Sequence, residues 1–265
     1  MNFHRDTLSG QVAFITGAGS GIGAATAEVL AEAGMHVALV DSDADRLATV
    51  RQKLRGAGRR AVAITTDVSD AHGIAAAYED TTAEFGRLDV VVANAGINGY
   101  WGPIDAFPLE EWDRVIKINL RGTFLTVKHA VPHLKARGGS IIVTASVNGT
   151  RMFSNTGATA YACSKAAQVT FTKMVALELA KYRIRVNVVC PGSVETHIDE
   201  TTHAERLREI REPVEFPAGV VPLKRGEPGR AEDVARLVWF LASPASSHIS
   251  GTELFIDGAQ SLLQG

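Results

Sequence analysis

The stretch that decides the fold is Thr16-Gly17-Ala18-Gly19-Ser20-Gly21-Ile22-Gly23. It follows the apolar run Val12–Thr16 and opens a segment, residues 22–33, that has the apolar spacing of a helix. Glycines between a strand and a helix let the backbone approach a pyrophosphate closely, and the free N–H groups at the helix N-terminus favour an anion. The glycine spacing differs from the usual Gly-x-Gly-x-x-Gly, but its position in the first strand–helix unit favours this interpretation.

Apolar runs of strand length alternate with helical patterns along nearly the whole chain. We expect strands at 12–16, 36–40, 61–65, 88–93, 140–144, 185–190 and 253–256, and helices at 22–33, 45–56, 72–85, 109–137, 161–182 and 232–242. Strands that are apolar throughout are typical of a parallel sheet covered on both faces. The sequence therefore predicts one domain over residues 1–265, with a doubly wound, Rossmann-type α/β fold.

Composition excludes several classes of function. The chain has 27 Lys plus Arg against 29 Asp plus Glu, a balance that gives no general attraction to nucleic acid or to an acidic membrane surface. No stretch approaches the roughly 18 apolar residues of a membrane span, and the N-terminus lacks the apolar core of a secretory signal. Two cysteines, Cys163 and Cys190, make no disulfide framework. We expect a cytoplasmic protein with neither nucleic acid nor membrane as a partner.

An acidic residue, Asp41, ends the second predicted strand about 20 residues past the glycine turn. A carboxylate there can accept hydrogen bonds from the hydroxyls of an adenosine ribose, and its charge would repel a 2′-phosphate. No Arg or Lys follows before Arg46. A plain turn-forming role stays open, because Asp43 and Asp45 stand nearby. We predict that the cofactor is NAD in preference to NADP.

Tyr161 and Lys165 are four residues apart near the start of a predicted helix, so they lie on one face of it. A phenol with a pKa near 10 is a poor base at neutral pH, but an adjacent ammonium favours the phenolate. Tyr161 could then take a proton from an alcohol, or return it in the reverse reaction. Alone, this pair is a weak signal because chance helices contain it often.

The pair belongs to a larger set of motifs in a fixed order. With the glycine turn, Asn94-Ala95-Gly96, Asn119, Ser146 and Pro191-Gly192, it resembles the ordinary, non-extended branch of the short-chain dehydrogenase/reductase family, from about Ser9 to Asp257. The resemblance implies a sheet of seven parallel strands, NAD(P)-dependent oxidoreduction of CH–OH groups and often a homotetramer. The helices at 109–137 and 161–182 could pair across subunits.

The resemblance also implies roles for single residues. Ser146 would bind the substrate oxygen, Tyr161 would be the acid/base, and Lys165 would lower the pKa of Tyr161 and hold the nicotinamide ribose. Asn119 would anchor a water in the proton relay, although a structural role stays open. Thr16 would brace the glycine turn together with residues 94–96. The implied cofactor-binding set is Gly17, Ser20, Gly21, Ile22, Gly23, Asp41, Asp67, Val68, Asn94, Ala95, Gly96, Tyr161, Lys165, Pro191, Gly192, Val194 and Thr196.

One departure from the family concerns the substrate side. Ser146 lies 15 residues before Tyr161, where the family usually has 13, so the extra length is expected in the loop Thr150–Thr159. Substrate contacts should come from loops at the carboxyl ends of the strands. From these loops we predict a substrate-binding set of Ser146, Asn148, Tyr161, Trp101 and Phe153.

The polar segment 193–217 follows the strand that should end beside the nicotinamide. Its composition and the helix-like spacing of Ala204–Arg211 predict a lid over the substrate, ordered by NAD. Glu195, His197, Asp199 and His203 superficially suggest a metal cluster. We expect no metal, because these residues lie on a loop predicted to be mobile.

The combined prediction is an NAD-dependent enzyme that moves a hydride between nicotinamide and a secondary alcohol or carbonyl. Mixed aromatic and polar residues in the substrate loops favour a polar small molecule such as a sugar, a polyol or a cyclic alcohol. Two alternatives stay open: a 3-oxoacyl-thioester reductase, and a catalytically silent NAD-binding sensor or scaffold on the same fold. An epimerase or dehydratase would need more chain after Asp257 than the sequence has.

Overall fold

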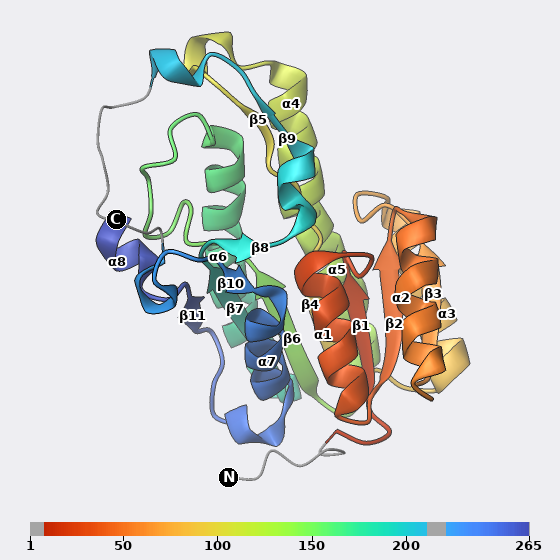
Figure 1. Cartoon of the computed structure of the whole chain (residues 1–265). Coiled ribbons are helices and arrows are strands. Elements are labelled where there is room, and N and C mark those ends of the chain that lie inside the picture. Colours follow the sequence, from red (N-terminus) through yellow and green to blue (C-terminus); the bar gives the residue numbers. More distant parts are fainter. Residues whose placement is uncertain (1–7, 211–220, 265) are drawn as a thin grey trace.

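Seven parallel strands form the central sheet of the chain, which a computed structural model describes for residues 8–210 and 221–264. The strands lie in the order β11-β7-β6-β4-β1-β2-β3, and every neighbouring pair is parallel (Figure 1). They are β1 (Val12–Thr16), β2 (His36–Asp41), β3 (Ala61–Thr65), β4 (Val90–Ala93), β6 (Gly139–Thr144), β7 (Ile184–Pro191) and β11 (Glu253–Ile256). This sheet confirms the predicted fold class.

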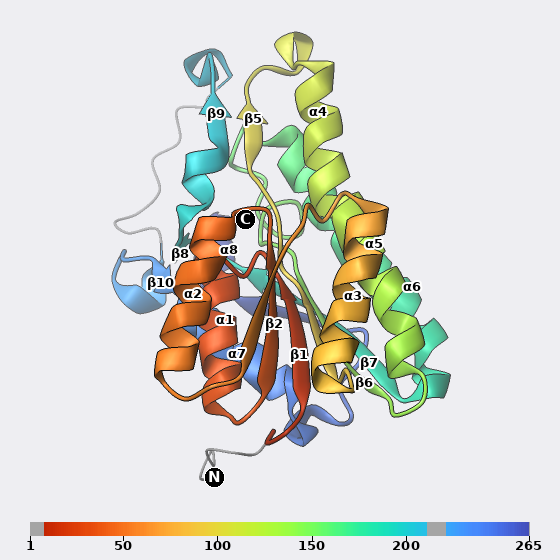
Figure 2. The ribbon, with the colours of Figure 1, turned by 90° about the vertical axis from the view of Figure 1, so that its right-hand side faces the viewer.

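Helices cover both faces of the sheet, as Figure 2 shows edge-on. One face carries α1 (Gly21–Glu32), α2 (Ala44–Gly56) and α7 (Ala231–Ala242); the other carries α3 (Ala71–Phe85), α5 (Gly122–Leu134) and α6 (Thr159–Leu179). Because both faces are covered, β1 and β4 are buried along their whole length. Strand order reverses between β1 and β4, and in such sheets ligands bind outside the carboxyl ends of the strands at this point.

The helix expected over 109–137 is three segments in the structure. They are α4 (Leu109–Val115), a π-helical turn (Ile116–Arg121) and α5, which ends at Leu134. Pro132 lies inside α5 and does not end it. Single-turn π segments inside α-helices are frequently found at functional sites, and this one contains Asn119.

Two short parallel ladders hold the chain that follows β7. β8 (Val194–Glu195) pairs with β10 (Gly229–Arg230), and β9 (Thr202–Ala204) pairs with β5 (Gly99–Trp101) in the upper part of Figure 1. The helix expected over 204–211 is wrong as far as residue 210, because residue 204 ends a strand and only Leu207–Glu209 form a 3₁₀ turn. Residues 211–217 of the predicted lid lie outside the described residues.

Candidate active site

The glycine turn is packed so closely that side chains cannot replace its glycines. A Cβ on Gly23 would lie 1.9 Å from the carbonyl oxygen of Gly17, and Gly17 itself has φ +66°. A positive φ and a contact this short both require glycine. Helix α1 begins at Gly21, and the side chain of its N-cap residue Ser20 bonds to none of the first N–H groups. The first turn of α1 has no acidic residue either, so its N–H groups and partial positive charge suit a pyrophosphate.

Hydrogen bonds tie the end of β1 to the end of β4. The hydroxyl of Thr16 accepts the N–H groups of Asn94 (3.0 Å) and Ala95 (3.2 Å). The amide of Asn94 donates to the carbonyl of Thr16 at 3.1 Å, and weakly to that of Gly17 at 3.4 Å. The glycine turn is therefore fixed against the neighbouring strand end, so its conformation is built in before any ligand arrives.

At the far end of the turn, Asp41 is held by two backbone groups. One carboxylate oxygen accepts the N–H of Gly19 at 2.9 Å and the other accepts the N–H of Asp43 at 3.1 Å. Each oxygen keeps a second lone pair, which a ribose hydroxyl could use. Asp67 accepts the N–H of Ser69 at 2.8 Å, a local bond that caps the turn after β3.

These elements border one groove of about 520 Å³, within the range of small-molecule and cofactor sites. Nearly all predicted cofactor-binding and catalytic residues line it: Gly17, Ser20, Gly21, Ile22, Asp41, Asp67, Val68, Asn94, Ala95, Gly96, Ser146, Tyr161, Lys165, Pro191, Gly192, Val194 and Thr196. Gly23 and Asn119, which are both buried, do not line it. The glycine cradle, the free helix N-terminus and the ribose acceptor at Asp41 together fit a dinucleotide.

The groove also has lining residues that are outside the predicted cofactor-binding and substrate-binding sets. The most notable are Arg46 on α2 and His197 and Glu200 on the 3₁₀ turn His197–Thr201. The sequence marks Arg46 only as the first basic residue after Asp41. No local pattern predicts its contact with Glu200, which stands 154 residues further along the chain.

Helix α6 presents Tyr161 and Lys165 on one face, both buried. The Lys165 ammonium donates to the carbonyl oxygen of Thr144 at 2.9 Å and lies 5.5 Å from the ring centre of Tyr161. Ser146, two residues past β6, lies close enough to the Tyr161 hydroxyl to lower its pKa. The oxygen of a substrate that reached Ser146 would thus meet a hydroxyl pair at the floor of the groove.

Burial sets the pKa values of both groups. Burial raises the pKa of Tyr161, the Ser146 hydrogen bond lowers it by less, and the charge of Asp199 raises it further. Burial lowers the pKa of Lys165 to about 8. Burial, Ser146 and Asp199 set the pKa of Tyr161, while the Lys165 ammonium donates to the Thr144 carbonyl. A lowering of the Tyr161 pKa by Lys165 stays a prediction.

Asn119, in the π-helical turn, is fully buried and joins three parts of the chain. Its side-chain oxygen accepts the N–H of Ile97 at 2.9 Å, and its NH₂ donates to the carbonyl of Ile97 at 2.9 Å and to the hydroxyl of Ser164 at 3.0 Å. Both amide protons and one acceptor position are therefore engaged by protein. This is the structural role left open for Asn119; its part in a proton relay stays a prediction.

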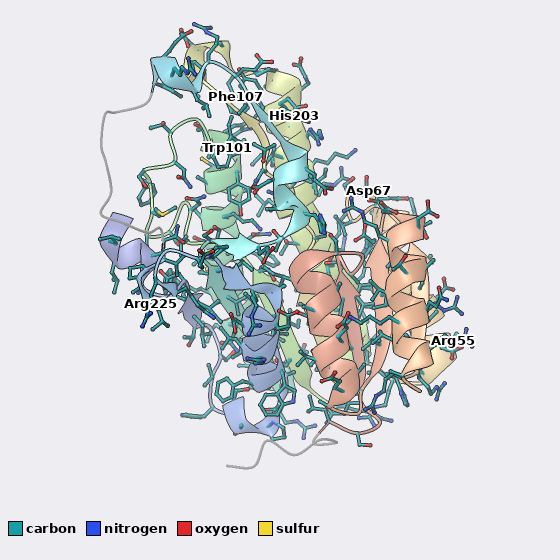
Figure 3. All side chains as sticks on the ribbon, viewed as in Figure 1. Arg55, Asp67, Trp101, Phe107, His203 and Arg225 are labelled. Carbon is teal, nitrogen blue, oxygen red and sulfur yellow. The ribbon has the colours of Figure 1, made fainter. Side chains whose placement is uncertain are left out.

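The substrate residues predicted from the loops do not gather at the groove, except for Ser146 and Tyr161. Phe153 is 72% exposed, and Asn148 instead accepts a hydrogen bond from Asn155 at 3.1 Å. Trp101 belongs to the β5–β9 ladder, in the upper region that Figure 3 labels, and its buried indole N–H has no partner among the described residues. The paths of the loops decide where these side chains lie. For Asn148 and Phe153, the extra length before Tyr161 made the path of the loop unpredictable from the sequence.

Two other kinds of site are absent from residues 8–210 and 221–264. No group of three or more His, Cys, Asp and Glu side chains is placed to hold a metal ion. No helix there is long and apolar enough to cross a membrane.

Comparison with known proteins identifies the family. A family model described as enoyl-(acyl carrier protein) reductase matches residues 17–259. Cis-4-hydroxycyclohexanecarboxylate dehydrogenase of Sinomonas cyclohexanicum is 38% identical over 256 residues, covering 96% of this chain and 97% of the relative. A 3-ketoacyl-ACP reductase structure from Sinorhizobium meliloti 1021 matches with a TM-score of 0.92 and 50% identity, covering 95% of this chain and 99% of that one. Carveol dehydrogenase from Mycobacterium avium in complex with NAD matches with a TM-score of 0.86 and 31% identity, covering 97% and 99%. This chain is an oxidoreductase that belongs to the short-chain dehydrogenase/reductase family.

Proposed function

We propose that this oxidoreductase uses NAD to interconvert a secondary alcohol and its carbonyl on a polar small molecule such as a sugar, a polyol or a cyclic alcohol. The observation that carries the proposal is that Ser146, Tyr161 and Lys165 lie together in the lining of a groove that also contains the glycine cradle. A dinucleotide lying along that groove supplies the hydride acceptor or donor.

The chain's own residues handle the proton and the geometry. Ser146 holds the substrate oxygen, and Tyr161 takes the hydroxyl proton in oxidation or gives it back in reduction. Lys165 supplies positive charge near Tyr161, and its ammonium has further N–H groups besides the one given to Thr144 that can bind the nicotinamide ribose. The buried position of all three excludes water from the proton transfer. Residues 193–210 form the described part of the cover over this floor, held at β8 and β9.

Preference for NAD over NADP rests on the charges at the adenosine end of the groove. Asp41 lies at the end of β2 beside the glycine turn, and Asp43 and Glu200 also line the groove. A 2′-phosphate would add roughly two negative charges beside these carboxylates. The NAD-bound carveol dehydrogenase neighbour is consistent with this preference.

The choice of substrate class is supported by one relative and by the charge of the cover. The Sinomonas relative is named for a hydroxylated cyclohexane ring. Residues 193–210 carry five acidic residues and two arginines. Such a surface disfavours the negatively charged phosphopantetheine arm of an acyl carrier, although the Sinorhizobium neighbour keeps the 3-oxoacyl-thioester reductase as the second candidate. A silent sensor is disfavoured because NAD binding alone has no need of a buried phenol.

The substrate and cofactor are tested together. Sugars, polyols, cyclic alcohols and hydroxy acids are each mixed with enzyme and either NAD or NADP, and the reduced-nicotinamide absorbance is followed; 3-oxoacyl thioesters are tested in the reducing direction. We expect turnover of a member of the first group, with kcat/KM at least about tenfold higher with NAD, because NADP brings a phosphate next to Asp41; tenfold corresponds to about 1.4 kcal/mol. Equal values or an NADP preference contradict the cofactor proposal, and turnover of thioesters alone contradicts the substrate class.

The acid/base role of Tyr161 is tested by Tyr161→Phe. The phenyl ring keeps the packing, and only the proton-transfer group is lost, so we expect kcat to fall by at least about 100-fold while NAD still binds. Steady-state kinetics with calorimetric titration of NAD measures both quantities. Substantial residual turnover would contradict the role. Tyr182→Phe, a half-buried tyrosine on the far end of the same helical region, is the matched control and should be near wild type.

We also propose a homotetramer, for which apolar side chains on two helices give support. On α6, Met174 is 70% and Leu177 84% exposed, and on α5 Phe124 is 44% exposed. An exposed apolar face of this kind marks an interaction surface. We expect light scattering at micromolar concentration to give four times the chain mass of 28.2 kDa. A monomer mass would refute the assembly, and Leu177→Glu should shift the mass downward without changing the fold.

A further inference from the structure

The adenosine end of the groove contains a positive charge that could bind the 2′-phosphate of NADP and so oppose a preference for NAD. Within the described lining, Arg46 is the one Arg or Lys besides Lys165, which lies at the opposite end. A Cβ built on Gly19 would lie 2.9 Å from the Cβ of Arg46 and 3.0 Å from a carboxylate oxygen of Asp41. Arg46 therefore stands directly beside the ribose acceptor. Guanidinium groups bind phosphates well, so a free Arg46 would suit the 2′-phosphate of NADP.

The guanidinium of Arg46 is not free, because two carboxylates hold it. Its Nη2 donates to Glu200 Oε2 at 2.8 Å, and its Nε lies 3.2 Å from Asp43 Oδ2. Asp43 also caps α2, where it accepts the N–H groups of Asp45 and Arg46, so it belongs to the helix start. Glu200 has no such local task. Its second oxygen meets His197 Nδ1 at 2.8 Å, which fixes the carboxylate toward Arg46.

Glu200 reaches Arg46 from the segment that covers the groove. It lies in the 3₁₀ turn His197–Thr201, which Thr196 caps through its hydroxyl and which leads directly into β9. The same turn is tied to the floor, because Thr201 accepts the N–H of Asn98 at 3.0 Å. The turn is thus held on both sides, and the position of the Glu200 carboxylate over the groove is part of the fold.

We propose that Glu200 is a positioning residue for cofactor specificity: by engaging the guanidinium of Arg46, it leaves a 2′-phosphate without a cation while the 2′-hydroxyl of NAD still has Asp41. The inference rests on the proposed use of NAD. It adds a second feature that disfavours NADP, besides the charge of Asp41. Asp41 repels the phosphate directly, whereas Glu200 acts through Arg46. Three carboxylates around one guanidinium leave the adenosine end of the groove with net negative charge.

The competing interpretation is that the Arg46–Glu200 pair only fastens the cover. A fastening role would change the affinity for both cofactors by the same factor, since NAD and NADP lie under the same cover. A specificity role changes the ratio of the two affinities. The ratio is therefore the readout that a merely structural pair does not move.

The test is calorimetric titration of NAD and of NADP, without substrate, into wild type, Glu200→Gln, Arg46→Gln and the double variant. Glu200→Gln should tighten NADP binding by about tenfold relative to NAD, because one phosphate–guanidinium contact becomes available. Arg46→Gln alone should leave the ratio within about twofold of wild type, and adding it to Glu200→Gln should remove the gain. Glu209→Gln, which breaks the equally exposed Arg206–Glu209 pair outside the groove, is the matched control and should change nothing.

The outcomes separate this inference from the proposed function. A wild-type protein that binds NADP more tightly than NAD contradicts the proposed cofactor. A wild-type preference for NAD with an unchanged ratio in Glu200→Gln overturns the role of Glu200 and leaves the cofactor standing. A gain that survives the loss of Arg46 in the double variant overturns it as well. Glu200 is solvent-exposed, and unfolding curves for the four proteins show whether the variants are folded.

Discussion

The constraint on which the site depends is the junction between Thr16 and Asn94. One buried hydroxyl accepts two backbone N–H groups from the end of the neighbouring strand, so two strand ends that lie 78 residues apart are fixed to each other. The glycine turn leaves from this junction, and Gly23 can approach Gly17 closely because it has no Cβ. A groove that is shaped beforehand avoids the cost of ordering a loop when a ligand binds.

A second junction holds helix α6, which carries Tyr161 and Lys165. Asn119 holds Ile97 through both its oxygen and its NH₂ group, and donates to Ser164, whose hydroxyl donates to the carbonyl of Tyr161 at 2.7 Å. The π-helical turn therefore links the loop after β4 to the first turn of α6. Lys165 ties the same helix to the end of β6 by donating to the carbonyl of Thr144. These buried bonds explain why residues from four distant segments can keep one arrangement at the floor of the groove.

Periodicity and glycine chemistry made the sheet, most helix bounds and the cofactor groove predictable from the sequence, because those features are set by local pattern. The strand at β9 was not predictable, since residues 202–204 acquire their conformation from pairing with β5. Trp101, Asn148 and Phe153 depend on loop paths that no local rule fixes. The Arg46–Glu200 pair and the raised pKa of Tyr161 depend on long-range contact and on burial, which appear only after folding.

The proposed chemistry depends on proton transfer by Tyr161 and on support of its ionised form by Ser146. Both roles are tested by the pH dependence of kcat/KM for alcohol oxidation in wild type and Ser146→Ala. Oxidation needs the phenolate, so kcat/KM should rise with pH through the pKa of Tyr161. The Ser146 hydrogen bond lowers that pKa, and its loss should move the rise to higher pH. A lower plateau with an unchanged midpoint would contradict the claim, because Ser146 would then serve only to bind substrate.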